Sequence, residues 1–451
     1  MGERDSELTS GLEALLAAHG AKGRVEGLVR LSGGASRETY AFDLVTDDGT
    51  RPLILQRVRQ GSLDTGPGIR GEAALLRLAE DQGVPVPTVV ADDDGTHVGA
   101  PALVAERLQG ETIARKLLRD DEWAEARSRI VGQAGAALAA VHRIPMADAP
   151  PLRDVDQLEE QQTLAATLGP PFPAFELALR WLARNRPTGR DHAVVHGDFR
   201  LGNLLIDRAG LRGVLDWEIS HVGDPVEDLG WYCVRAWRFG SPLPAGGMGT
   251  REELLAAYAA AGGGVVEPEV LRWWELLGTV RWGLICHVQA SAHLGGIVRS
   301  MELATIGRRV AENEWDVLGL LPGDPLPTDA TPPAPDDQEL HGRPTARELV
   351  EAVREWIEGD VRDATDGRVA FHTRVAANAL HMVERELALG EEQRRRHAAG
   401  LATLGCTSDQ ELAERIRSGE LDDRADEVRQ VLAAMVRAKL EVANPRWLEA
   451  D

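Results

Sequence analysis

The residue types that could do chemistry gather in two short stretches of the chain, HGDFRLGN at 196–203 and VLDWE at 214–218. Asp198 can orient a hydroxyl group and accept its proton, as a general base does. The amide oxygen of Asn203 and the carboxylate of Asp216 are hard oxygen ligands of the kind that Mg²⁺ binds in proteins. Transfer of a phosphoryl group from ATP needs metal cations, a positioned hydroxyl and little else. These three residues therefore predict phosphoryl transfer from Mg·ATP to a hydroxyl group.

Short strands are expected to hold these side chains at fixed separations. Residues of β type precede the first stretch at 194–195, follow it at 204–206 and lead into Asp216 at 214–215. A single Asp, Asn or His in a loop is more often a turn former or a helix cap, so the prediction depends on the whole set in this context. His196 is expected to organise the loop through hydrogen bonds and not to act as the base.

The first third of the chain has the pattern of a small antiparallel sheet with one helix. Segments rich in β-type residues are separated by turn chemistry and lie at 25–31, 39–45, 52–58, 88–91 and 102–106. Apolar residues at 72–82 have helical spacing, and that segment ends at Gly83. Amphipathic helices dominate after residue 110, so the fold class is predicted to be α+β.

The spacing H-G-D-x-x-x-x-N, followed by an apolar pair and Asp216, resembles the signature of the aminoglycoside phosphotransferase and choline kinase-like family, relatives of the protein kinases. The resemblance implies a bilobal protein-kinase-like fold that uses ATP and Mg²⁺. It implies Asp198 as the catalytic base, with Asn203 and Asp216 as metal ligands. In GDPVEDL, it implies that Asp228 braces the catalytic loop.

The same resemblance implies a set of nucleotide-binding residues upstream. The loop LSGGAS, with Gly33, Gly34 and Ser36, lies between two predicted strands as the phosphate-covering loop does in this family. Glu72 matches the helix glutamate that pairs with a strand cation holding the nucleotide phosphates. Glu106 matches the hinge between the lobes, which meets adenine through its backbone.

The strand cation is where the sequence departs from the family pattern. The third strand reads LILQR at 53–57 and contains no lysine. Arg57 is favoured for the role because it is charged, and Gln56 is the alternative without a charge. The two side chains are expected on opposite faces of the strand.

By this resemblance, residues 1–322 form the phosphotransferase domain, with a sheet lobe at about 24–106 and a mainly helical lobe at about 107–322. Residues 323–345 are rich in Pro, Asp, Thr and Gly without apolar periodicity, which predicts a linker. Residues 346–451 alternate amphipathic helical stretches, which predicts a separate all-α accessory domain.

The acceptor stays open between an aminoglycoside, a choline-like alcohol, a sugar and a hydroxyacyl thioester. The stretches at 273–293 and 301–318 resemble the kinase portion of multidomain acyl-CoA dehydrogenases, whose members phosphorylate hydroxyacyl groups. The tail resembles a helical domain of unknown function that accompanies some of these kinases. Two rivals remain: a pseudokinase-like nucleotide-binding module that recruits a partner, and a metal-dependent hydrolase built on His196 and Asp198.

Composition limits the partners and the compartment. The 451 residues include 50 basic and 72 acidic ones, and the net charge of −22 argues against binding to nucleic acid or anionic lipid. The three cysteines show no CxxC spacing, and no apolar run is long enough to span a bilayer. Residues 1–10 are charged and lack an apolar signal core, so a cytoplasmic enzyme with a small-molecule substrate is expected. The sequence does not indicate an oligomeric state.

Overall fold

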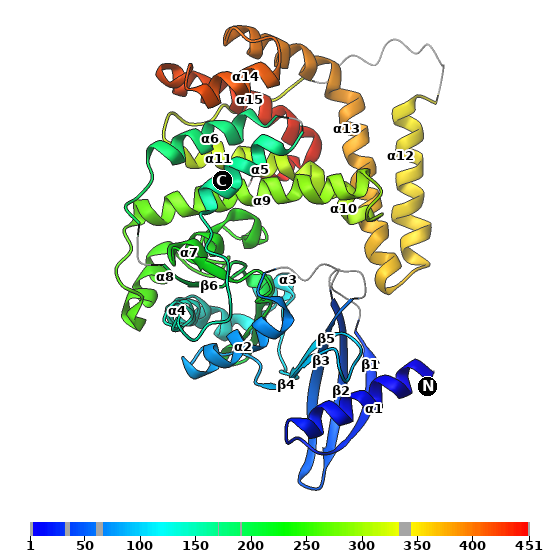
Figure 1. Ribbon diagram of the computed structural model, residues 1–451. Coiled ribbons are helices and arrows are strands. Elements are labelled where there is room, and N and C mark those ends of the chain that lie inside the picture. The colour runs from blue at the N-terminus through cyan, green and yellow to red at the C-terminus, as the bar shows by residue number, and fades with distance from the viewer. Residues whose placement is uncertain are drawn as a thin grey trace. The chain divides into compact units, whose positions relative to one another are not determined.

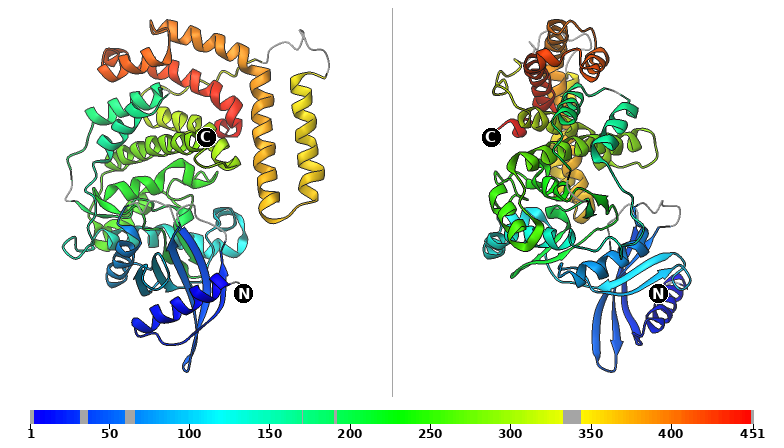
Figure 2. Two further views of the ribbon diagram at one scale, coloured as in Figure 1. Left: turned by 45° about the vertical axis from the view of Figure 1, so that its right-hand side comes forward. Right: turned by 60° about the vertical axis from the view of Figure 1, so that its left-hand side comes forward.

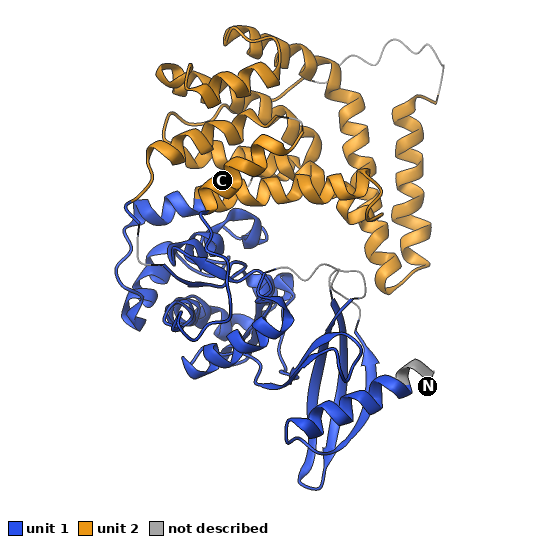
Figure 3. Cartoon of the chain, viewed as in Figure 1, with its two compact units in different colours: residues 1–156, 188–275 blue, residues 157–187, 276–451 orange. Residues whose placement is uncertain are grey.

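The computed structural model describes residues 3–31, 37–59, 66–169, 171–189, 192–332 and 344–449. The chain forms two compact units, shown in Figure 3. Unit 1 consists of residues 1–156 and 188–275, and unit 2 consists of residues 157–187 and 276–451. Figure 1 labels the elements of both units.

Unit 1 contains an antiparallel sheet of five strands in the order β1-β2-β3-β5-β4. The strands are β1 (Arg24–Arg30), β2 (Arg37–Thr46), β3 (Gly49–Val58), β4 (Val89–Asp94) and β5 (Pro101–Glu106). Apolar side chains of α1 (Glu3–Ala18) pack with buried residues of β2 and β3, and Figures 1 and 2 show this helix lying across the strands. The helix α2 (Gly68–Asp81) packs against β4 and β5.

The alternation of β3 decides which of its side chains reach which face of the sheet. Leu53 and Leu55 are fully buried in the core with α1, so Ile54 and Gln56 point to the other face. The prediction of a small antiparallel sheet with one helix is confirmed, and the structure adds α1 on the second face.

The rest of unit 1 is mainly helical, with two small sheets around the predicted catalytic stretch. The helices are α3 (Ala114–Arg119), α4 (Ala124–Val141), α7 (Val226–Cys233), α8 (Arg251–Tyr258) and the first residues of α9 (Pro268–Leu294). β6 (Ala193–Val195) pairs with β9 (His221–Gly223), and β7 (Leu204–Asp207) pairs with β8 (Gly210–Val214). These strand pairs hold both ends of the 196–203 loop, as the sequence predicts.

The described part of unit 2 contains helices and their connecting segments but no strand. Besides the remainder of α9, its helices are α5 (Gln157–Thr167), α6 (Pro173–Arg184), α10 (Met301–Ile306), α11 (Val310–Leu320), α12 (Ala346–Trp356), α13 (Gly367–Thr403), α14 (Asp409–Ser418) and α15 (Ala425–Ala443). Figures 1 and 2 show α12 beside α13, and the two helices are in contact.

The division between the units differs from the predicted boundary at 323–345. The C-terminal helices do not stand apart, because α14 packs on α6 and α15 packs on α11 and α6. Charged pairs tie the same helices together: Arg180 with Asp422 at 2.7 Å, Lys439 with Glu314 at 2.9 Å, and Arg417 with Glu176. The linker composition marks an irregular stretch of chain and does not reveal which helices pack together, and the separate domain at 346–451 stays a prediction from the sequence.

Within the described part of the chain, no single helix is both long and apolar enough to cross a membrane. One bent pair, Arg251–Gly263 with Pro268–Leu294, reaches that length and apolarity only together.

Candidate active site

Asp228 holds the backbone of the 196–203 loop. Its fully buried carboxylate accepts hydrogen bonds from the backbone N–H groups of His196 at 2.8 Å and Gly197 at 2.9 Å. His142 adds a third contact at 3.1 Å through Nε2, and its Nδ1 lies 2.9 Å from the hydroxyl of Tyr258. Burial alone would raise the pKa of Asp228, but the contacts with His142 and His196 outweigh it and hold that pKa below its ordinary value. The predicted bracing role of Asp228 is confirmed.

His196 shapes the loop and is not placed to act as a base. Its Nε2 lies 3.1 Å from the carbonyl oxygen of Leu215, and its Nδ1 accepts a hydrogen bond from the backbone N–H of Asp198 at 3.2 Å. Burial lowers the pKa of His196 despite the nearby carboxylates of Asp228 and Asp198, so the ring is neutral. Both ring nitrogens serve the loop, in agreement with the role predicted from the sequence.

Three side chains donate hydrogen bonds to the carboxylate of Asp198. Asn203 Nδ2 donates to Oδ2 at 2.6 Å and Trp231 Nε1 donates to Oδ1 at 2.9 Å. Arg200 Nε lies 3.0 and 3.1 Å from the two oxygens. The structure therefore fixes the orientation of Asp198 and brings it together with Asn203, as predicted.

Arg200 and Trp231 were not predicted. Arg200 stands two residues after Asp198, so its charge was visible in the sequence, whereas no sequence signal connects Trp231 with the loop. The guanidinium of Arg200 lies 4.9 Å from the ring centroid of Trp237, within the range of a cation–π contact. A Cβ at Gly202 would lie only 2.4 Å from Arg200 Nη1, so this glycine leaves the space that the guanidinium occupies.

Asp216 follows β8 in a strained backbone conformation beside other carboxylates. Its φ of 67° is one of two positive values among the described non-glycine residues. Partial desolvation in the cleft, helped by Glu218, Asp198 and Glu72, raises the pKa of Asp216 to about 6.

These carboxylates fit a divalent cation. Negative charge exceeds the positive charge that Arg37 supplies nearby, and a cation would relieve it. Asn203 Nδ2 donates to the backbone oxygen of Asp198 at 3.0 Å as well as to its carboxylate, so the amide oxygen is the atom that remains to face a metal ion. Asn203 and Asp216 thus offer the oxygen atoms that such an ion would bind, and their metal-ligand roles stay a prediction.

Glu72 pairs with Arg37 and not with Arg57. Arg37, the first residue of β2, forms a buried ion pair with Glu72 and lies 3.6 Å from Glu218. The backbone N–H of Trp217 also donates to Glu72 at 3.3 Å. Burial disfavours the charged guanidinium, but Glu72 outweighs it and raises the pKa of Arg37. The cation that neutralises the helix glutamate therefore comes from the start of the second strand.

The expectation that Arg57 fills this role is wrong. In the β2–β3 register Arg57 lies opposite Glu38, and its Nη2 binds that carboxylate at 2.5 Å. Its Nη1 donates to the carbonyl oxygen of Val98 at 2.9 Å. Strand alternation sends Gln56, and not Arg57, into the cleft.

A cavity of about 500 Å³ lies beside these groups. Its apolar walls come from both the sheet and the strands after the catalytic loop, and include Leu31, Ala41, Ile54, Leu76, Leu103, Ala105, Leu108, Leu205 and Val214. Glu72 and Asp216 also line it. The apolar walls suit a flat ring, and Glu72 and Asp216 add carboxylates to the lining.

The remaining residues that were predicted to bind the nucleotide either line this cavity or lie outside the residues that the structure describes. Glu106 lines the cavity, its carboxylate binds Arg51 at 2.8 Å, and its backbone N–H donates to the carbonyl oxygen of Thr88 at 3.0 Å. Gly33, Gly34 and Ser36 lie outside the described residues. Leu31 and Arg37, which flank that loop, are both near the cleft.

The sequence profile of the phosphotransferase enzyme family, APH, matches residues 27–274, more than half of the 451-residue chain. The chain belongs to this family. A second profile, of a domain of unknown function, DUF6285, matches residues 363–447. The predicted family and the predicted accessory domain of unknown function are both confirmed.

Relatives of known name fall into two groups. Acyl-CoA dehydrogenase family member 10 of Mus musculus is 30% identical over 238 residues, which cover 49% of this chain and 21% of that protein. Aminoglycoside 3'-phosphotransferase of Streptomyces fradiae is 32% identical over 174 residues, which cover 36% of this chain and 62% of that enzyme. The chain thus matches about a fifth of the length of the dehydrogenase relative.

The fold agrees with this family. A crystal structure from Ralstonia eutropha, assigned to the aminoglycoside phosphotransferases, superposes with a TM-score of 0.56 at 22% identity. The match covers 68% of this chain and 97% of the other. The predicted protein-kinase-like fold, with a sheet lobe, a helical lobe and additional C-terminal helices, is confirmed.

Proposed function

We propose that this phosphotransferase transfers the γ-phosphoryl group of Mg·ATP to a hydroxyl group of a small molecule. The observation that carries the proposal is that Asp198, Asn203 and Asp216 lie close together, with Asp216 lining the cavity. Asn203 touches Asp198 at 2.6 Å, and the charge of Asp198 contributes to the raised pKa of Asp216. Carboxylate and amide oxygens next to a cavity with apolar walls suit a metal-bound nucleotide.

In this reaction Asp198 accepts the proton of the acceptor hydroxyl. The acceptor oxygen attacks the γ-phosphorus while the bond from that phosphorus to the bridging oxygen breaks, and ADP leaves. Asn203 and Asp216 would hold Mg²⁺, which when bound would neutralise charge on the phosphate oxygens. The backbone near Glu106 meets the adenine ring, and the phosphate-covering role of Gly33, Gly34 and Ser36 stays a prediction from the sequence.

The acceptor that we favour is a hydroxyacyl thioester. The support is the similarity to acyl-CoA dehydrogenases from several organisms, whose names refer to acyl-CoA. An aminoglycoside is the second choice, supported by the match to the Streptomyces fradiae enzyme.

A nucleotide-binding module without catalysis is the rival function. It is favoured by Gln56, an uncharged residue that faces the cavity on the strand where the family pattern has a cation. Against it stands the Arg37–Glu72 pair, which supplies a cation from the neighbouring strand. A hydrolase built on His196 and Asp198 gains no support, because both ring nitrogens of His196 are occupied by contacts with the backbone of the loop and of Leu215.

A screen of candidate alcohols distinguishes these possibilities. The full chain is incubated with Mg·ATP and each of a hydroxyacyl-CoA set, an aminoglycoside set and simple sugars, with ADP release measured and phosphorylated product confirmed by mass. Product from one class supports the proposal and names the acceptor. ATP binding without product from any class would favour the binding module.

A further inference from the structure

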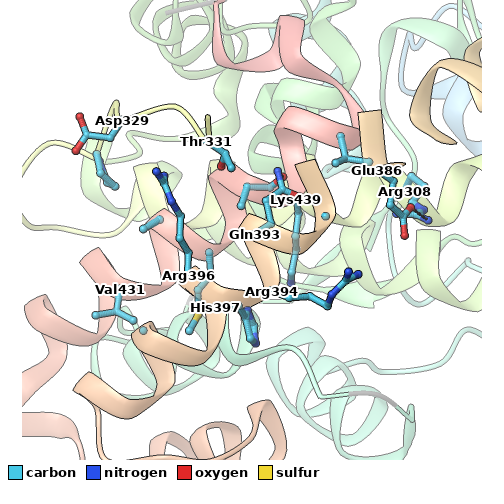
Figure 4. A pocket seen from close by; sticks show the side chains of 17 residues that line it. Arg308, Asp329, Thr331, Glu386, Gln393, Arg394, Arg396, His397, Val431 and Lys439 are labelled. Atoms are coloured by element: carbon cyan, nitrogen blue, oxygen red, sulfur yellow. Dashed lines mark hydrogen bonds and ion pairs between the residues drawn. The ribbon is translucent and has the colours of Figure 1, made fainter. Parts of the chain in front are cut away.

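Unit 2 contains a cavity of about 460 Å³ between α13, α15 and the extended segment that precedes α12. Figure 4 shows Gln393, Arg394, Arg396 and His397 projecting from α13, together with Val431 and Lys439 of α15. Asp329 and Thr331 line it from the extended segment. This segment is held in place, since the N–H of Thr331 donates to Glu441 at 2.9 Å.

The lining is rich in cations although the chain is strongly acidic. Four arginine or lysine side chains line the cavity against two carboxylates, in a chain of net charge −22. Three of these cations have carboxylate partners: Arg308 binds Glu386 at 2.7 Å, Arg396 binds Glu392 at 2.9 Å, and Lys439 binds Glu314 at 2.9 Å.

Arg394 is the exception. Among the residues that the structure describes, it has no hydrogen-bond or ion-pair partner, although it lines the cavity. Its Nη1 would lie 3.5 Å from a Cβ placed on Gly390, one turn earlier on α13. The free guanidinium therefore lies over a glycine at the wall of the cavity, with its donors available to an anion.

The floor of the cavity is apolar. Val431, Met435 and Val442 lie on one face of α15, with Ala434 and Ala438 between them. Gly390 and Gly400 of α13 also line the cavity, at a cost of about 1 kcal/mol each relative to alanine inside a helix. A side chain at Gly400 would meet Met435 at 2.8 Å, and Gly390 leaves the wall below Arg394 open.

We propose that this cavity binds an amphipathic anion, a carboxylate or phosphate head on an aliphatic chain, with the head at Arg394 and the chain along Val431 and Met435. An unpaired guanidinium gives a head group a charge-assisted contact, and the α15 floor removes the chain from water. The volume lies in the range of sites for small organic ligands. The site is independent of the phosphotransferase cleft and gives a ligand to the domain of unknown function at 363–447.

Titration calorimetry on the full chain tests the proposal, with octanoate and octyl phosphate as probes, each below its micelle concentration. Octanol serves as the probe without an anionic head group, and inorganic phosphate serves as the probe without an aliphatic chain. At least one anionic probe binds, and the tighter of the two identifies the head group. Octanol and phosphate bind at least about tenfold more weakly.

Two matched variants connect binding with the cavity. Arg394→Gln weakens the anionic probe about tenfold or more, whereas Arg395→Gln, at the exposed neighbouring arginine that binds Glu392, leaves it unchanged. Ala434→Trp fills the cavity from an exposed position and abolishes binding, with an unchanged circular dichroism spectrum showing that the chain is folded. Absence of binding by both anionic probes overturns the proposal, and so does equal binding by wild type, Arg394→Gln and Ala434→Trp.

Discussion

Arg200 binds the carboxylate of Asp198 through one nitrogen, with Nε 3.0 Å from Oδ1 and 3.1 Å from Oδ2. The guanidinium that makes this contact lies over Trp237 and fills the space above Gly202. Asp198 is thus held by a cation that itself contacts two neighbours. Since only Nε of the guanidinium contacts Asp198, the proposed function would have Arg200 supply positive charge to the transferred phosphoryl group.

Arg200→Gln is therefore expected to lower kcat about 10- to 100-fold, because the base loses its orientation and the transferred group loses a positive charge. KM for ATP changes little, since the nucleotide pocket keeps its walls. Arg200→Lys restores only part of kcat, because an ammonium group cannot stack and donate in the same geometry. Steady-state kinetics with Arg212→Gln, at an exposed position on β8, as the control check this. Equal kcat in the Arg200→Gln variant and the control would show that Arg200 has no part in turnover.

Because Arg37, and not Arg57, pairs with Glu72, the variants Arg37→Ala and Arg57→Ala are expected to differ in stability and in ATP binding. Arg37→Ala leaves the buried carboxylate of Glu72 without its partner and is expected to cost about 3–5 kcal/mol in the free energy of unfolding, with weaker ATP binding. Arg57→Ala removes a half-buried pair with Glu38 and is expected to leave ATP affinity unchanged. Urea unfolding and nucleotide titration measure both effects. Loss of ATP binding in Arg57→Ala, with none in Arg37→Ala, would restore the assignment made from the sequence.

The raised pKa of Asp216 predicts how pH affects metal binding. In the folded chain this pKa is about 6, above its ordinary value of 3.8, so the folded state favours the protonated form. The resulting stabilisation is complete below about pH 4 and is lost as pH rises through about 6. Mg²⁺ binds the ionised carboxylate, so its own stabilising effect grows over the same interval.

Thermal unfolding with and without Mg²⁺ at about pH 5 and about pH 7.5 measures this. The increase in Tm caused by Mg²⁺ is expected to be larger at the higher pH, and Asp216→Asn should remove the difference. An equal Mg²⁺ effect at both pH values in the wild type would contradict the role of Asp216.

The sequence could predict the parts of the site that are close together along the chain. Asp198 and Asn203 share one loop, and the strands that hold them are short β-type segments on either side, so local spacing was sufficient. Asp228 could be placed only through the family resemblance. The structure supplies the physical reason, two backbone N–H groups that would otherwise be buried without partners.

Contacts between distant segments could not be predicted in the same way. Arg37 and Glu72 meet because β2 and α2 face one cleft, and charge alone did not distinguish Arg37 from Arg57. Strand alternation predicts that Gln56 and Arg57 point to opposite faces of the sheet. It does not indicate which face borders the cavity. That choice depends on α1, whose leucines cover the face that carries Leu53 and Leu55. The packing of α14 and α15 against α6 and α11 could not be predicted either, because these helices are also distant along the sequence.

We propose Asp198 as the base of this phosphotransferase, and Asp198 does not line the cavity proposed for the nucleotide. Single-turnover measurement with Mg·ATP and the acceptor found in the screen tests it most directly, with ATP affinity determined on the same samples. The account predicts that Asp198→Ala binds ATP like the wild type and loses at least about 10³-fold in the rate of product formation. Product formation at the wild-type rate in Asp198→Ala would contradict it.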